Sequence, residues 1–164
     1  MVHSDKSGSN KSGDEASKVL RKFRLVFNAV KTHFQQIERK VGIGGAQVWA
    51  LSVIDRSPGL GVTALAQVMD IHQTTASNLI KSLVSAELIV VEKDSRDRRS
   101  VQLFIKAAGK NILKKVPGPF EGILPNALGQ LDEHTLARLN ADLGALLLLI
   151  EADEAAAQIP LAQV

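Results

Sequence analysis

The sequence contains no cysteine among its 164 residues. This absence excludes disulfides, thiolate metal ligands, cysteine nucleophiles and redox sensing through cysteine. The four histidines, His3, His33, His72 and His134, stand far apart and show no paired spacing of metal ligands. We therefore expect no metal site and no other cofactor.

Long apolar runs and catalytic motifs are also missing. The longest aliphatic run, from Leu146 to Ile150, is far too short to span a bilayer. Residues 1–13 lack the apolar core of a secretory signal. The chain has no glycine-rich phosphate loop after a strand, no G-x-S-x-G and no H-E-x-x-H. These absences predict a cytoplasmic protein that is not an enzyme and has no membrane partner.

The charge is distributed unevenly along the chain. Residues 1–40 carry nine Lys or Arg and four Asp or Glu, and residues 41–117 carry ten and six. Residues 118–164 carry one and seven, which makes the last third acidic. This pattern fits a protein with one surface that meets a polyanion, and it also fits ordinary solvated charge.

Apolar periodicity predicts a mainly helical fold with one small hairpin. We expect helices over residues 14–40, 46–56, 64–69 and 73–86, with Thr63 as the N-cap of the third. Strands are expected over 88–93 and 100–105. A helix is expected over 106–116, where Pro117 interrupts it and Pro125 limits its continuation. A last helix should run from Asp132, its N-cap, to about Ala157.

This order predicts a winged helix-turn-helix flanked by dimerisation helices. We divide the chain into a flexible tail (1–13), an N-terminal dimerisation helix (14–45), the DNA-binding domain (46–110) and C-terminal dimerisation helices (111–164).

The helix over 73–86 has an unusual outward face. Opposite its apolar residues lie short hydrogen-bonding side chains and one cation, with no carboxylate: Thr74, Ser77, Asn78 and Lys81. Such side chains contact base edges and phosphates in the major groove. A solvated helix face usually mixes Glu with Lys, so the pattern favours DNA recognition.

The turn between the two strands carries four bases and two acids, Lys93-Asp94-Ser95-Arg96-Asp97-Arg98-Arg99. An arginine at a hairpin tip is drawn into a minor groove by its negative potential, and a nearby Asp can orient the guanidinium. The alternative is a surface hairpin with salt bridges, but the position directly after the recognition helix argues against it.

The segment from Leu65 to Ile105 resembles the winged helix-turn-helix of the MarR family of bacterial regulators, and Asp94, Arg96 and Arg99 match the family pattern Asp-x-Arg-x-x-Arg. The resemblance implies a dimeric DNA-binding regulator, often a repressor that a small ligand releases. It places Arg96 in the minor groove with Asp94 holding it, and Arg99 bracing the wing. The chain departs from the family at His72, where a Ser-like cap is usual, and at Asn78, where arginine is frequent.

Both terminal helices are more apolar than one packing face requires, which favours a homodimer over an internal helix pair. Two recognition helices one duplex turn apart would read a palindromic operator. The resemblance also implies a small aromatic or lipophilic effector. Two alternatives stay open, a protein-interaction module that docks an acidic partner and an architectural DNA binder without sequence choice or ligand control.

Overall fold

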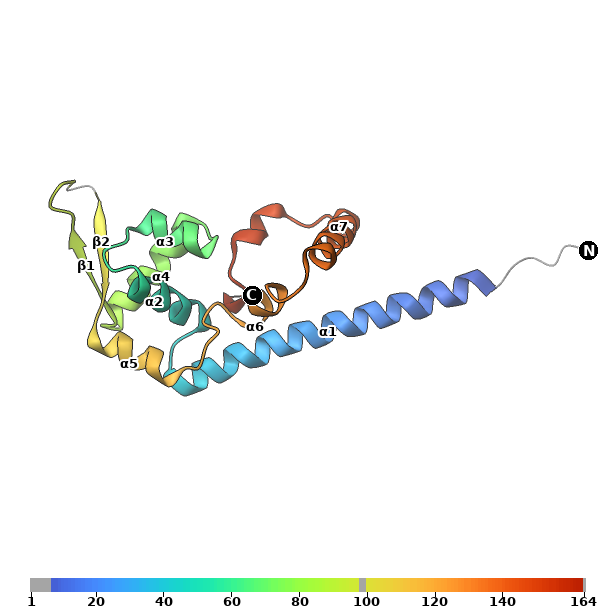
Figure 1. The fold of residues 1–164 in the computed structure, drawn as a ribbon, viewed down its shortest axis with the longest axis horizontal. Coiled ribbons are helices and arrows are strands. Elements are labelled where there is room, and N and C mark those ends of the chain that lie inside the picture. The colour runs from blue at the N-terminus through green and yellow to red at the C-terminus, as the bar shows by residue number, and fades with distance from the viewer. Residues whose placement is uncertain (1–6, 98–99, 164) are drawn as a thin grey trace, which may run out of the picture.

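The computed structural model describes residues 7–97 and 100–163, and it shows a helical lobe with one hairpin and a long projecting helix (Figure 1). Helix α1 (Ser7–Val41) leads into α2 (Gly45–Arg56), α3 (Val62–Met69) and α4 (Gln73–Ser85). Strands β1 (Ile89–Lys93) and β2 (Val101–Ile105) follow, then α5 (Ala107–Lys115), α6 (Ile123–Leu128) and α7 (Glu133–Leu149). Two short 3-10 helices, η1 (Glu154–Gln158) and η2 (Leu161–Gln163), come last. The predicted fold class is confirmed.

Helix α1 is longer than the sequence predicted, because it begins at Ser7 and includes residues that we assigned to a flexible tail. It ends where Gly42 adopts a φ of 77° and donates its N–H to the carbonyl of Glu38 at 2.8 Å. Between residues 12 and 41, the first buried side chain is Val30. The N-terminal half of α1 therefore lies free of the lobe, as Figure 1 shows.

Helix α2 is the centre of the lobe. Its apolar side chains are buried almost all round, and it packs against α3, α4, α5 and β2. Helix α3 begins two residues earlier than expected, because Gly61 is the N-cap and Thr63 lies inside the first turn. Asp70 then adopts a left-handed conformation (φ 51°), which ends α3 and allows α4 to start after His72.

The hairpin is antiparallel and runs from the pair Ile89–Ile105 to the pair Lys93–Val101. Leu103 is fully buried, and its backbone also pairs with the segment after α2, since its N–H donates to the Leu60 carbonyl at 3.0 Å. The carbonyl of Leu103 accepts the N–H of Gly59 at 2.8 Å. The edge of β2 that faces away from β1 is therefore fixed to the segment after α2.

The C-terminal third differs most from expectation. Helix α6 was not predicted, and its Pro125 lies in the first turn, where a missing N–H costs no helical hydrogen bond. Helix α7 ends at Leu149 rather than near Ala157, and η1 and η2 follow. The Asp132 N-cap is confirmed, because its carboxylate accepts the Thr135 N–H at 2.9 Å and the Thr135 hydroxyl at 2.7 Å. Across the described residues, no helix has the length and apolarity needed to cross a membrane.

Candidate nucleic-acid interface

The outward face of α4 is set by the four side chains that anchor the helix. Ala76, Leu79, Ile80 and Leu83 are all buried, with relative exposures of 0–7%. On the opposite side the structure brings together the predicted recognition residues: Thr74, Asn78 and Lys81 are exposed and Ser77 is half-buried. The helix contains no acidic residue. The helix itself therefore presents no carboxylate to a polyanion, while Glu38 of α1 lines a hollow that Asn78 also lines.

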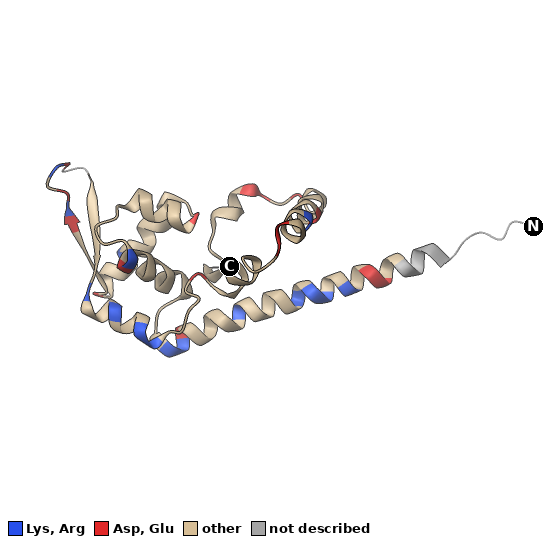
Figure 2. Cartoon of the chain, in the orientation of Figure 1, with Lys and Arg blue, Asp and Glu red and all other residues tan. Residues whose placement is uncertain are grey.

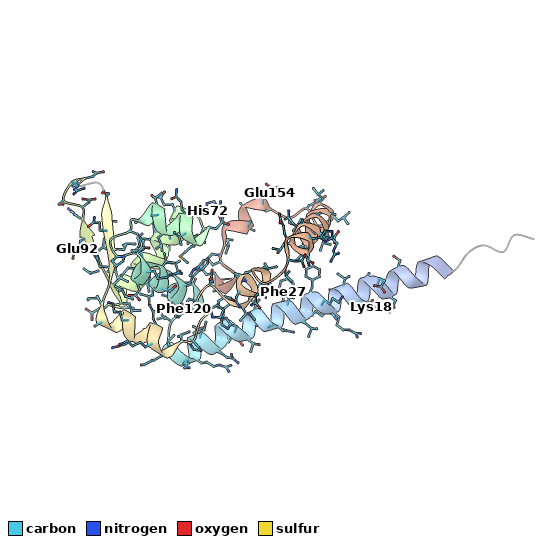
Figure 3. The ribbon with its side chains drawn as sticks, viewed as in Figure 1. Lys18, Phe27, His72, Glu92, Phe120 and Glu154 are labelled. Carbon is cyan, nitrogen blue, oxygen red and sulfur yellow. The ribbon has the colours of Figure 1, made fainter. Side chains whose placement is uncertain are left out.

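The N-terminus of α4 begins without a side-chain cap. His72 occupies the N-cap position with an extended backbone, and its side chain makes no capping hydrogen bond. The first N–H groups of a helix lack intrahelical partners and carry the positive end of its dipole. They can therefore donate to an anion such as a phosphate oxygen. Figure 3 shows His72 at the start of α4 and Glu92 on the wing, at opposite ends of the lobe.

The wing tip is shaped by Asp94, though not as the sequence suggested. The Asp94 carboxylate accepts the backbone N–H of Arg96 at 2.8 Å, and among the described residues it forms no ion pair with the Arg96 guanidinium. A carboxylate that holds the main chain two residues on defines an Asx turn. The side chain of Arg96 stays exposed at the tip. Arg99, the third predicted wing residue, lies outside the described residues.

A hydrogen bond between α2 and α4 was missed by the sequence reasoning. The amide of Gln47 donates to the hydroxyl of Ser82, and its oxygen accepts the N–H of Gly44 at 2.8 Å. Gln47, Asn78 and Ser82 share an open hollow of about 370 Å³ with Gln163 of the chain end. No local pattern could reveal the Gln47–Ser82 bond, because it joins residues 35 positions apart.

The junction between α1, α2 and α5 contains the groups that could receive a small molecule. A hollow of about 300 Å³ is lined by Ser52, Leu113 and Phe120 and rimmed by charged side chains. Trp49 is half-buried and packs against the core. His33 is half-buried, its Nε2 has no hydrogen-bond partner among the described residues, and burial lowers the pKa of its imidazole. Within residues 7–97 and 100–163, no three His, Asp or Glu side chains gather as metal ligands would.

Comparisons with known proteins bear on this geometry. Residues 41–100 match the model of the MarR family. The crystal structure of MarR shares 26% sequence identity with this chain and has a TM-score of 0.51. The match covers 58% of this chain and 70% of the MarR chain. MepR in the S. aureus MepR–DNA complex shares 21% sequence identity with this chain and has a TM-score of 0.57. The match covers 79% of this chain and 96% of the MepR chain.

Streptococcus pneumoniae FabT in complex with DNA is 16% identical with a TM-score of 0.53, over 83% of this chain and 97% of that one. At these lower identities the MepR and FabT structures show the shared fold alone. A search of curated proteins finds no match. The resemblance read from the sequence is nevertheless confirmed by the family model, which matches residues 41–100, the segment that contains α2, α3, α4 and β1.

Proposed function

We propose that this protein is a homodimeric, double-stranded DNA-binding transcriptional regulator. The observation that carries the proposal is the exposed face of α4, which has hydrogen-bonding groups and a cation but no carboxylate. Its position beside a wing that exposes Arg96 gives two contact points on one lobe. The match to the MarR family model over residues 41–100 supports the proposal, as do the DNA complexes of MepR and FabT, which share the fold.

In the proposed docking, α4 enters the major groove and the wing tip enters the adjacent minor groove. Asn78 is suited to a bidentate contact with adenine, and Lys81 to guanine or phosphate. Thr74 and Ser77 stand near the start of the helix, where side chains and free N–H groups reach the backbone. Arg96 enters the minor groove, Asp94 fixes its turn, and Arg99 braces the wing.

The dimer is proposed from the apolar surface of the terminal helices. Helix α7 has no buried residue, and its Leu148 and Leu149 are 82% and 83% exposed. Helix α1 exposes Leu20, Leu25 and Phe27 on its projecting half. A second copy would cover both surfaces and set two recognition helices one duplex turn apart, about 34 Å, so the operator is a palindrome.

Ligand control is a further part of the proposal. The hollow lined by Ser52, Leu113 and Phe120 lies between α2, α5 and the segment that precedes α6. A volume of about 300 Å³ with an apolar floor suits a small aromatic or lipophilic effector. We propose that such an effector releases a repressor from DNA.

The test is selection of bound duplexes from a random-sequence pool, followed by binding measurements at several salt concentrations. Wild-type protein should enrich a palindrome, and Asn78→Ala should cost about 1–3 kcal/mol of discrimination at one base pair. Lys81→Ala should lower the salt slope by about 1, whereas Lys31→Ala on α1 should leave it unchanged. Failure to bind any duplex at low salt contradicts the proposal, and binding without an enriched palindrome favours an architectural DNA binder.

A further inference from the structure

A second cationic surface lies away from α4 and from the tip of the wing. It comprises Lys106, Lys110, Lys114 and Lys115 on and before α5, with Arg39 and Lys40 at the end of α1; we call it the basic edge. All six side chains are exposed. Figure 2 shows this charge along α5 and the adjoining end of α1, with the wing tip on the other side of the lobe.

The charge of the basic edge is hardly neutralised within the chain. Among the described carboxylates, only Asp55 comes within 4.0 Å of one of these cations, at 3.9 Å from Lys110 Nζ, and both side chains are exposed. Helix α5 contains no acidic residue. Closely spaced unpaired cations raise the local potential and attract a polyanion.

The arrangement of the lysines suits an extended, regularly charged partner. Lys106, Lys110 and Lys114 follow each other at intervals of four residues, so they share one helix face over about 12 Å. Lys40 lines a hollow with Val116, which joins the end of α1 to the end of α5. Lys110 and Lys114 also line the hollow of about 300 Å³ beside Ser52 and Phe120, whereas the other four cations of the basic edge lie outside it. The six cations together therefore form a stripe, as a ladder of phosphates requires.

The packing of α5 argues against a membrane as the partner. Its apolar residues Ile112 and Leu113 pack against both core clusters. A helix that lies on a bilayer needs an apolar face free to enter the acyl boundary. Helix α5 offers only its charged side, so the partner is a polyanion in water.

The position of the basic edge separates it from the proposed recognition face. Helix α2 packs against α5 and also against α3 and α4, and it lies between the two surfaces. We propose that the basic edge binds the phosphate backbone of a second DNA segment, without sequence preference. The protein would then join two duplex segments, one at α4 and the wing and one at α5.

This proposal extends the proposed function but can be tested apart from it. The probe is a random-sequence duplex of about 30 base pairs, long enough for several phosphate contacts on both surfaces. One duplex is fixed to beads and loaded with full-length protein, and capture of a second, fluorescent duplex is measured at about 50 mM and about 200 mM salt.

The edge variant is Lys110→Gln, Lys114→Gln and Lys115→Gln, which removes three charges and keeps helix propensity. The matched control is Arg21→Gln, Lys22→Gln and Arg24→Gln, which removes three charges from exposed positions of α1. We expect the edge variant to bind the first duplex within about twofold of wild type but to capture at least about tenfold less second duplex. Its salt slope for the second duplex should fall by about 3, because each phosphate contact contributes about 0.9.

If the edge variant captures as much second duplex as wild type, the proposal is overturned. If the control loses as much capture as the edge variant, net charge alone explains the loss, and the proposal is also overturned. The proposal would also be overturned if the basic edge bound polyglutamate but not duplex DNA, because that result would indicate an acidic protein partner. If Arg96→Ala abolishes selective binding while edge-dependent capture persists, the two surfaces act independently. If wild-type protein enriches no operator yet shows edge-dependent capture, the proposed function fails and the basic edge stands.

Discussion

Gly109 lies where α5 crosses the base of the wing, and replacing it tests how tightly the two pack. A Cβ at this position would lie 2.6 Å from the carbonyl oxygen of Leu88 and 2.7 Å from Cγ1 of Ile105. The Leu88 carbonyl cannot easily move, because it also accepts the N–H of Lys106 at 2.9 Å. Gly109→Ala must therefore push α5 away from the hairpin.

The size of the effect follows from two opposing contributions. Alanine favours a helix over glycine by up to about 1 kcal/mol. Forcing a methyl group into a packed contact costs about 1–3 kcal/mol. Since the closest atom is backbone, we take the middle of that range and expect Gly109→Ala to lower the free energy of unfolding by about 1 kcal/mol.

Urea unfolding measures this change as a shift in midpoint at constant slope. The control is Ala108→Gly, at an exposed neighbouring position of the same helix, which should lose up to about 1 kcal/mol through propensity alone. If Gly109→Ala instead stabilises the protein by the amount that the control loses, the close packing of α5 on the wing is refuted.

Three other changes test separate parts of the molecule. Arg96→Ala should weaken operator binding by about 1–3 kcal/mol in fluorescence anisotropy and leave the dimer intact, and unchanged affinity would refute the minor-groove placement. Leu149→Glu places a charge on an 83% exposed apolar position of α7 and should yield monomers in sedimentation at micromolar concentration; wild-type protein that is already monomeric would contradict the dimer. Burial lowers the pKa of His33, so between about pH 7 and about pH 5 the unfolded chain takes up a proton that the folded chain resists, and stability falls with acidification. His33→Gln should flatten this fall in urea unfolding, and an unchanged pH dependence would show that His33 does not cause it.

The core of the fold could be predicted from the sequence because its signals are local. The spacing of Ala76, Leu79, Ile80 and Leu83 fixes which face of α4 is buried, and the opposite face follows from helix geometry alone. The alternation of Val101, Leu103 and Ile105 likewise identifies the strand that enters the core. The recognition residues that we propose on α4 were identified in this way.

Other features depend on contacts between distant segments or on weak local preferences. The Gln47–Ser82 bond has no sequence signature, nor has the return of the chain end to the lobe, where Pro160 is buried and η2 contacts α1 and α2. Helix α6 is too short for a periodic pattern, and Pro125 hides it further. For Asp94, the residue was identified but its partner was not, because a carboxylate can hold either a guanidinium or a backbone N–H.

The free half of α1 links the folding of this protein to its concentration. Between residues 12 and 29 no side chain is buried, so this stretch, about 27 Å of helix, has no tertiary support from its own lobe. Helices in proteins owe most of their stability to packing, so this stretch lacks the main source of stability that the packed half of α1 has. In the proposed homodimer a second copy covers this stretch, so the helicity of α1 should rise with protein concentration, as measured by circular dichroism across a dilution series. The number of copies present would then determine how much of the chain is folded.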